Sequence, residues 1–351
     1  MHSIRKYDNV LLFTNGAIGD FLMAALCADS IGKKLVGSTI SILTPRNAAL
    51  LRDLFSAYPH VRVYEINRRH FLRLILLVIR KAWQKNIVVN QVVFKKIPIH
   101  LQLFARLLTM RPGSTYARFT QKDAGNGALI FDSRLSAYEN LARLVNTQNL
   151  NVSLSVPPYR FVRDPRVFER YGLGRSSYVV VHPCAWSASR SLPVTRWADL
   201  LRYVTVNFPD LKIVITGSAY DRSFIQKIFD TTSSTVKFVN LAGKLSMMEL
   251  ANIVDGARGY VGVDTGITHL AGVLRKPSVI IGNRSNPYWL PHYNENAVIL
   301  TESKNCTCDG KKGGNCFYRT GEEKYYKCML DIPEESIYEK IKHMLMKERR
   351  A

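Results

Sequence analysis

The sequence predicts an α/β protein built from two doubly wound parallel-sheet domains. The chain has 351 residues, which fits two domains of about 150 residues each. Short apolar strands alternate with helical patterns in both halves, an alternation typical of parallel sheets. The alternation of strands and helices begins again after a stretch with several prolines and glycines. We therefore expect an N-terminal domain over 1–157, a linker over 158–177, a C-terminal domain over 178–330 and a final helix over 331–351.

In the first half, a buried strand leads through a glycine-containing turn, at 15–20, into an apolar helix. The pattern then alternates between strand and helix up to residue 66, residues 68–120 differ in character, and 129–132 indicates a return to the sheet. The expected strands are 10–13, 39–43 and 61–66, and the expected helices are 21–31 and 48–56.

The second half is more regular. Ser246 and Glu249 fit a capping box at the start of one helix. The chain ends in a basic amphipathic helix over 334–350, with Ile337 and Ile341 on its apolar face. The expected strands are 178–182, 211–216, 236–240, 259–264 and 277–282, and the other expected helices are 194–207, 221–229, 246–257 and 268–274.

The net charge of +22 predicts a polyanionic partner: a nucleic acid, an anionic membrane surface or a phosphorylated substrate. Residues 68–120 are basic and apolar and contain no acid. They can contact a membrane or form ordinary helices with solvated basic faces. No apolar run reaches the ~20 residues of a membrane span, so we expect a cytoplasmic protein. The basic residues of this segment are Arg68, Arg69, Arg73, Arg80, Lys81, Lys85, Lys95, Lys96, Arg106, Arg111 and Arg118.

The turn after the strand at 259–264 is the strongest candidate for binding a ligand. Asp264 ends the strand, and Thr265 and Gly266 lead into a helix that carries His269. At the carboxyl end of a parallel sheet, such a helix start offers backbone N–H groups to a nucleotide diphosphate. The alternative is an ordinary turn with a capping side chain and a hydrogen-bonded histidine.

Two further turns of this half carry polar side chains. Ser187 and Arg190 follow the strand at 178–182, and an arginine fork suits phosphate oxygens. Gly217, Ser218 and Asp221 follow the next strand, where a carboxylate can bind a ribose hydroxyl. The alternative for the first turn is a solvated loop, and the signal of the second is weak by itself.

The turn at 15–20 holds Gly16, Gly19 and Asp20. Its G-x-x-G spacing differs from the dinucleotide fingerprint, and no Walker lysine follows, which argues against an NTPase. A carboxylate at such a turn can act as the general base for a hydroxyl acceptor. The alternative is that Asp20 only caps the following helix.

Taken together, these blocks resemble the lipopolysaccharide heptosyltransferases, glycosyltransferase family 9. DTGITHLA at 264–271, followed by Pro277, is similar to the family's D-T-G-x-x-H-L-x-A block, and GDFL at 19–22 is similar to its G-D-x-L. RSLP at 190–193, followed by Arg196 and Trp197, is similar to the K-x-W-P…W stretch, with Leu192 in place of the tryptophan. The resemblance spans nearly the whole chain, but residues 68–150 match only in general character.

The resemblance implies the GT-B fold, two Rossmann-like domains facing a central cleft. It implies that the C-terminal domain binds a sugar nucleotide, typically ADP-heptose, and the N-terminal domain a lipopolysaccharide inner-core acceptor such as Kdo-lipid A. It also implies inversion of the anomeric centre in one displacement, without a bound metal or other cofactor. The protein would then work on the cytoplasmic face of the bacterial inner membrane, in contact with anionic lipid.

By the same resemblance, Asp20 is the catalytic base, and Gly16 and Gly19 lie on the acceptor side with basic residues of 68–120. Arg190 takes the place of the family's phosphate-binding lysine, and Asp221 that of an acid near the donor ribose. The full expected donor set is Ser187, Arg190, Gly217, Ser218, Asp221, Asp264, Thr265, Gly266 and His269.

Cys306, Cys308, Cys316 and Cys328 resemble a cysteine-bearing tail of some family members. They can hold a structural zinc or remain free thiols, and the C-x-C spacing is tighter than usual zinc pairings. Disulfides are not expected in a reducing cytoplasm.

Two alternative functions remain open from the sequence. One is a GT-B transferase that uses another sugar nucleotide, such as a UDP-hexose. The other is a basic nucleic-acid-binding protein, although the basic stretch has no recognisable nucleic-acid motif.

Overall fold

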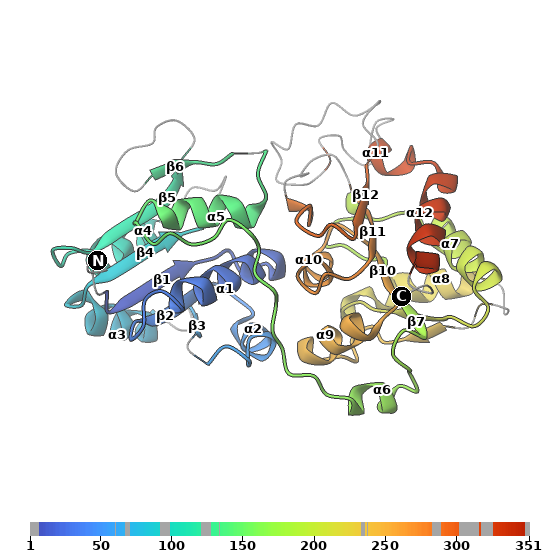
Figure 1. The fold of residues 1–351 in the computed structure, drawn as a ribbon, viewed down its shortest axis with the longest axis horizontal. Helices are drawn as coiled ribbons and strands as arrows, with labels where there is room; N and C mark the ends of the chain where they lie inside the picture. The colour runs from blue at the N-terminus through green and yellow to red at the C-terminus, as the bar shows by residue number, and fades with distance from the viewer. Residues whose placement is uncertain are drawn as a thin grey trace. The chain divides into compact units, whose positions relative to one another are not determined.

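The structure is a computed structural model that describes residues 7–59, 61–66, 71–91, 99–120, 128–132, 134–232, 236, 238–282, 289–301, 316 and 326–347. The chain forms two compact units, Met1–Val162 and Arg163–Ala351. The division lies within 158–177, the expected linker. Figure 1 labels the elements of each unit, and each unit is described by itself.

The first unit contains one parallel sheet whose six strands follow the order β3-β2-β1-β4-β5-β6. The order reverses between β1 and β4, so their carboxyl ends form the topological switch point at which such sheets bind ligands. Its elements are β1 (Asn9–Phe13), α1 (Ile18–Gly32), β2 (Thr39–Thr44), α2 (Ala48–Leu54), β3 (Val61–Glu65), α3 (Phe71–Ala82), β4 (Asn86–Asn90), α4 (Ile99–Leu108), β5 (Thr115–Thr120), β6 (Ala128–Ile130) and α5 (Ala137–Asn146).

The central strands β1 and β4 are buried along their whole length, as expected for parallel strands covered on both faces. α1 and α5 contact each other, and so do α3 and α4. Val78 of α3 and Phe104 of α4 pack in one apolar cluster with Leu11 of β1 and Val88 of β4. α3 and α4 therefore cover the sheet face that carries Leu11 and Val88.

The segment 68–120 is more than the pair of helices that we considered from the sequence. It contains α3 and α4, but it also supplies β4 and β5, two strands of the sheet that we did not predict. β4 pairs with β1 on one side and β5 on the other. Much of the apolar character of the segment is therefore explained by the core of the first unit.

The second unit repeats the same topology with its own six parallel strands, in the order β12-β11-β10-β7-β8-β9. Here the switch point lies between β7 and β10. Its elements are α6 (Arg166–Arg170), β7 (Tyr178–His182), α7 (Val194–Asn207), β8 (Lys212–Ile215), α8 (Arg222–Thr231), β9 (Phe238–Asn240), α9 (Met247–Gly256), β10 (Gly259–Val263), α10 (Gly266–Val273), β11 (Ser278–Ile281), β12 (Ala297–Leu300), α11 (Lys327–Leu330) and α12 (Glu334–Lys347), with 3₁₀ turns at Ala188–Arg190 and Ala219–Asp221.

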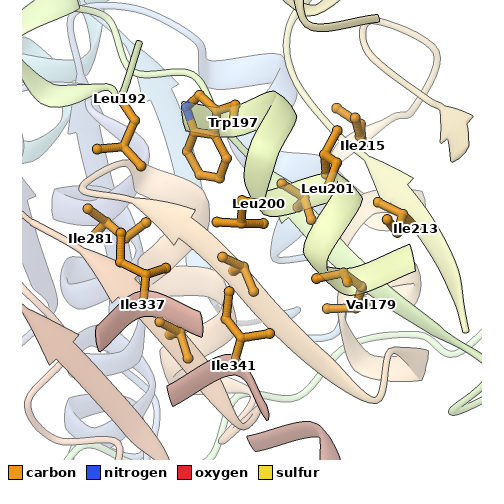
Figure 2. Packing of buried hydrophobic residues seen from close by; sticks show 14 of the residues in the cluster. Val179, Leu192, Trp197, Leu200, Leu201, Ile213, Ile215, Ile281, Ile337 and Ile341 are labelled. Atoms are coloured by element: carbon orange, nitrogen blue, oxygen red, sulfur yellow. The ribbon is translucent and has the colours of Figure 1, made fainter. Parts of the chain in front are cut away.

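The core of the second unit joins α7 and α12 to the sheet. Figure 2 shows Trp197 and Leu200 of α7 close to Ile281 of β11 and to Ile337 and Ile341 of α12. The predicted apolar face of the last helix is therefore confirmed, because all its members are buried. The predicted capping box is also confirmed, since the Ser246 side chain accepts from Glu249 N and the Glu249 carboxylate accepts from Ser246 N.

Within the described residues, no helix has the length and apolar character needed to cross a membrane. The described cysteines are free thiols. Cys27 is buried, and burial raises its pKa to about 12. Cys328 lies in the core of the second unit, whereas Cys306 and Cys308 lie outside the described residues.

Candidate functional site

The switch point of the second unit brings Arg190 and Asp264 together. β7 and β10 are neighbours, with His182 opposite Gly262, so the turns that follow them start side by side. Arg190 lies in the first turn and Asp264 in the second, and Nη1 of Arg190 is 3.4 Å from Oδ2 of Asp264. Only 10% of the arginine side chain and 8% of the aspartate side chain are exposed. The pair therefore places a cation at the end of the sheet, held by a buried acid.

The loop that carries Arg190 is fixed by local hydrogen bonds. Ser191 Oγ donates to the carbonyl of Pro183 at 2.5 Å, and the indole N–H of Trp197 donates to Ser191 Oγ at 3.4 Å. Trp197 is fully buried in α7, so this contact anchors the loop to the core. The guanidinium of Arg190 also lies 5.5 Å from the ring centre of Trp186, whose side chain is exposed.

α10 begins directly after Asp264, two residues earlier than the helix we expected over 268–274. Thr265 is its N-cap, and the Thr265 side chain accepts a hydrogen bond from Ile267 N at 3.2 Å. Gly266 is the first helical residue, which leaves backbone at the helix start without a covering side chain. The capping threonine of our alternative reading is thus present, and a helix N-terminus lies beside Arg190 and Asp264.

His269 lies within the first turns of α10 and is 5% exposed. Its Nδ1 atom is buried and makes no hydrogen bond to the described residues. Burial lowers the pKa of His269 to about 4, and the charge of Arg190 acts in the same direction. The ring is therefore neutral at neutral pH. Buried polar atoms are almost always paired, so the unpaired imidazole nitrogen makes His269 a candidate contact for a ligand.

Burial raises the pKa of Asp264, and the charge of Arg190 opposes this rise. The arginine therefore favours the ionised carboxylate, and the carboxylate fixes the position of the guanidinium. A guanidinium keeps its positive charge at neutral pH and presents its N–H donors in a planar fork. The arrangement suits an anion that approaches the carboxyl ends of β7 and β10.

The turn after β8 is organised around Asp221. Oδ2 of Asp221 accepts hydrogen bonds from Ser218 N at 2.6 Å and from Ser218 Oγ at 2.7 Å, which closes a capping box. Gly217 lies under this turn, and a Cβ atom there would come within 3.1 Å of Asp221 Cβ. Ser187 is tied to Ser189 by a 2.9 Å contact between their hydroxyls. Both turns are therefore preformed.

In the first unit, the structure corrects the position of Gly19 and Asp20. We predicted them in a turn ahead of a helix over 21–31, but α1 begins at Ile18, so both residues lie in its first turn. The N-cap is Ala17, whose side chain makes no capping hydrogen bond. Asp20 is 8% exposed, and a carboxylate in the first helical turn is stabilised by the helix dipole.

Gln91 is a residue of this site that the sequence analysis missed. Its side-chain N–H donates to the backbone carbonyl of Asp20 at 2.9 Å, which links the end of β4 to the start of α1. Gln91 follows β4 directly, so recognising that strand would have identified it. Asp20 therefore lies at the switch point of the first unit.

Gly16 adopts a φ of +80°, and a Cβ atom there would come within 2.7 Å of Arg46 Cγ and 2.9 Å of Thr44 Oγ1. The carbonyl of Gly16 accepts a hydrogen bond from the Asn47 side chain at 3.3 Å. Glycine is therefore required in this turn by its conformation and by the space around it.

The basic residues of 68–120 do not share one environment. Lys81 is buried and donates to the side chain of Asn9, and burial lowers its pKa to about 8. The side chain of Arg73 and residues 68, 69, 95 and 96 lie outside the described parts. The exposed cations are Arg80, Lys85, Arg106, Arg111 and Arg118.

Cys316 lies near the loop that carries Arg190, because its backbone N–H donates to Ser189 Oγ at 3.4 Å. The sulfur of Cys316 accepts from Tyr326 N at 3.1 Å. Among the described residues, no cluster of histidines, cysteines and acids is arranged to hold a metal ion. The zinc interpretation remains untested, because Cys306 and Cys308 are not described.

Two tandem doubly wound units, each with polar side chains at its switch point, define an α/β protein of the GT-B class. Comparison with protein families narrows this class. The model of glycosyltransferase family 9 (heptosyltransferase) matches residues 139–316. The chain belongs to this family.

Individual relatives agree with this assignment. The chain is 26% identical to lipopolysaccharide heptosyltransferase 1 of Campylobacter coli over 168 residues, 47% of this chain and 46% of the relative. It is 24% identical to lipooligosaccharide heptosyltransferase 2 of Haemophilus influenzae over 137 residues, 38% of each chain. The matches thus span less than half the length of these two relatives.

Solved structures match over nearly the whole chain. The structure of Escherichia coli ADP-heptose lps heptosyltransferase II superposes with a TM-score of 0.72 at 18% identity, covering 97% of this chain and 99% of the other. A family 9 glycosyl transferase from Veillonella parvula gives a TM-score of 0.74 at 16% identity, covering 97% and 98%. The predicted fold class is therefore confirmed.

Proposed function

We propose that the protein is an inverting glycosyltransferase that moves a heptose from a sugar nucleotide, ADP-heptose, to the inner core of lipopolysaccharide. The observation that carries this proposal is the group at the carboxyl ends of β7 and β10. Arg190, the unpaired Nδ1 of His269 and the start of α10 together form an anion site on the nucleotide-binding fold. Two E. coli heptosyltransferase structures contain ADP and ADP-2-deoxy-2-fluoro heptose, which supports an adenine nucleotide as the donor.

On the donor side, the diphosphate lies at the N-terminus of α10, where Gly266 has no side chain to cover the start of the helix. Arg190 faces the phosphates while Asp264 holds its guanidinium in place. As the bond between the anomeric carbon and the phosphate oxygen breaks, negative charge grows on the departing diphosphate. A fixed arginine and oriented backbone N–H groups stabilise that charge without reorganisation.

On the acceptor side, Asp20 accepts the proton of an acceptor sugar hydroxyl. The hydroxyl oxygen forms a bond to the anomeric carbon on the face opposite the diphosphate, so the configuration inverts. The helix dipole of α1 favours the ionised carboxylate, and the Gln91 contact fixes the backbone of Asp20. The proposal requires the two units to bring Asp20 to the bound donor during the reaction.

The proposed acceptor is Kdo-lipid A or its heptosylated form, which is anionic and lipid-borne. The proposal therefore places the protein at the cytoplasmic face of the bacterial inner membrane. The net charge of +22 supports an anionic surface as partner, because such a charge concentrates the protein near it.

The test uses purified full chain, ADP-heptose and Kdo-lipid A, with product followed by mass spectrometry and ADP binding by calorimetry. We expect Asp20→Asn to bind ADP as tightly as the wild type and to lose transfer on the order of 10³-fold. Asp53→Asn, in helix α2 of the same unit, is the matched control and should retain transfer.

Undiminished turnover of Asp20→Asn would rule out Asp20 as the base. A wild-type protein that binds no ADP would contradict the donor site. Transfer from a UDP-hexose, with none from ADP-heptose, would replace the proposed donor by the alternative and keep the class of reaction.

A further inference from the structure

Helix α3 exposes an apolar stripe on the side that faces away from the sheet. Leu76, Ile79 and Trp83 are exposed, with 83% of Trp83 accessible just beyond the helix end. Arg80 is exposed on the same stripe, since positions i, i+3, i+4 and i+7 share one helix face. Val78, on the other side, packs into the core.

Helix α4 repeats this arrangement. Leu103 and Leu107 are exposed with Arg106 between them at helical spacing, and Met110, two residues beyond the helix end, is also exposed. Phe104 packs into the core in the opposite direction. Each helix therefore exposes two large apolar side chains and one arginine, and the segment just beyond its end adds a third apolar side chain.

The two stripes belong to one surface. α3 and α4 contact each other, and Figure 1 labels both helices within the first unit. The guanidinium of Arg111, just after α4, donates to the backbone carbonyl of Trp83, just after α3. The carboxyl ends of the two helices are thereby joined. We define the α3–α4 surface as Leu76, Ile79, Arg80, Trp83, Leu103, Arg106, Leu107 and Met110.

The charge of this surface and its rim is positive. Arg80 and Arg106 lie on it, and Lys85 and Arg111 are exposed beside its end. The segment 68–120 contains no acid. The carboxylate of Asp8 accepts a hydrogen bond from Lys85 N at 2.8 Å, which places one acid at the rim. Cations still outnumber acids among these residues.

We propose that the α3–α4 surface docks on an anionic phospholipid bilayer. The apolar side chains enter the interfacial layer and the arginines contact lipid phosphates, as in other amphipathic surface helices. Trp83 suits the headgroup level, where tryptophan is enriched. This inference deepens the proposed function by naming the surface that brings the enzyme to a lipid-borne acceptor. The role of the docking rests on the proposed function, whereas the docking itself is argued from the surface alone.

Other partners fit this surface less well. A second copy of the chain, docked by the same face, would bring two positively charged surfaces together, and like charges repel. A nucleic acid would use the cations but leave the leucines, Ile79 and Met110 in water. A bilayer with anionic headgroups satisfies both the apolar and the charged side chains.

The test is co-sedimentation of the full chain with vesicles of phosphatidylcholine alone or mixed with phosphatidylglycerol, without donor or acceptor. We expect strong binding to the anionic vesicles and binding at least about tenfold weaker to the neutral ones. Arg80→Gln and Arg106→Gln should each weaken binding about fivefold. Leu76→Ser combined with Trp83→Ser should weaken it on the order of tenfold or more.

Matched controls come from exposed positions of the second unit. Val206→Ser replaces an exposed apolar residue of α7, and Lys340→Gln replaces an exposed cation of α12. Both should bind vesicles within about twofold of the wild type, since neither lies on the α3–α4 surface. All variants should bind ADP like the wild type, which shows that they are folded.

A second readout is tryptophan fluorescence with brominated lipids. Quenching should be largely lost in Trp83→Phe, because the proposal places Trp83 in the lipid layer.

Equal vesicle binding by surface and control variants would overturn the proposal. So would surface variants that abolish dimerisation or DNA binding and leave vesicle binding intact. A wild-type protein that binds vesicles but transfers no sugar would contradict the proposed function and leave the surface standing.

Discussion

The guanidinium of Arg190 lies 3.4 Å from the carboxylate of Asp264, with both side chains almost completely buried. The contact exists because β7 and β10 are neighbours in the sheet, although β8 and β9 lie between them in the chain. Breaking a buried ion pair by removing one partner costs about 3–5 kcal/mol, because the other charge stays buried alone. The pair therefore acts on stability as well as on the proposed donor site.

The first prediction concerns this pair. Arg190→Met should lower the free energy of unfolding by about 3 kcal/mol, because Asp264 loses its counter-charge. Adding Asp264→Asn should recover part of that loss, so the two changes will not be additive. Urea unfolding of both single variants and the double variant measures this coupling. The exposed pair Arg166–Asp164 is the control, and Arg166→Met should cause no measurable change. Additive effects at 190 and 264 would contradict the prediction.

The second prediction separates strain from crowding at Gly16. Gly37 has a φ of +88° and nothing within 4 Å of an added Cβ atom, so Gly37→Ala should cost about 1 kcal/mol from conformation alone. Gly16→Ala adds the approach to Arg46 and Thr44 and should cost about 2–3 kcal/mol. Thermal or urea unfolding compares the two. Transfer should fall only for Gly16→Ala, because its turn leads to Asp20. Equal costs would show that the turn adapts.

The third prediction concerns pH. Burial lowers the pKa of both His182 and His269 to about 4, from an ordinary value of 6.5. Between these values the unfolded chain binds protons that the folded chain does not, so stability falls as pH decreases from 6.5 to 4. The raised pKa of Asp264 acts in the opposite direction, because folding then favours its protonated form.

Comparison with a variant isolates the histidine contribution. Between pH 7 and pH 4.5, the wild type should lose about 2 kcal/mol more than His182→Asn, as judged by urea unfolding. Asparagine can still hydrogen-bond to Thr216, which contacts His182 Nδ1 at 2.9 Å. The same pH dependence in both proteins would argue against a neutral buried His182.

The fourth prediction tests the role of α12 in the core of the second unit. Ile341 is fully buried against the sheet, whereas Met346 is 49% exposed on the same helix. Ile341→Ala should lower the free energy of unfolding by about 3 kcal/mol, and Met346→Ala should change it by less than about 0.5 kcal/mol. Urea unfolding monitors both. A small effect at Ile341 would mean that α12 is not part of the cooperative unit.

The sequence predicted the strands whose apolar runs stand alone between polar turns, including β7, β8 and β10. It missed β4, because Asn86–Asn90 is short and lies among other apolar runs, where a strand cannot be separated from a helix by periodicity. It placed the start of α1 too late because the N-cap, Ala17, has no side chain that signals a cap. The start of α10 was misplaced by two residues although Thr265 is a normal cap.

The individual residues of the candidate site could be predicted from the sequence, but their arrangement in space could not. Asp264, Arg190 and His269 were each candidates, but their proximity depends on the strand order, which places β7 beside β10. The unpaired Nδ1 of His269 reflects the packing around α10, which no local pattern encodes. Likewise, the exposed stripes of α3 and α4 follow from which helix faces meet the sheet. The apolar composition of 68–120 by itself could not distinguish core from surface.

Both units repeat one strand order, and each has its own reversal point with its own loops. The loops after β1 and β4 belong to the first unit, and the loops after β7 and β10 belong to the second. Under the proposed function, donor choice and acceptor choice depend on separate sets of loops, so each can diverge without the other during evolution. Exchanging one half between homologues would provide a route to new pairings of sugar and acceptor.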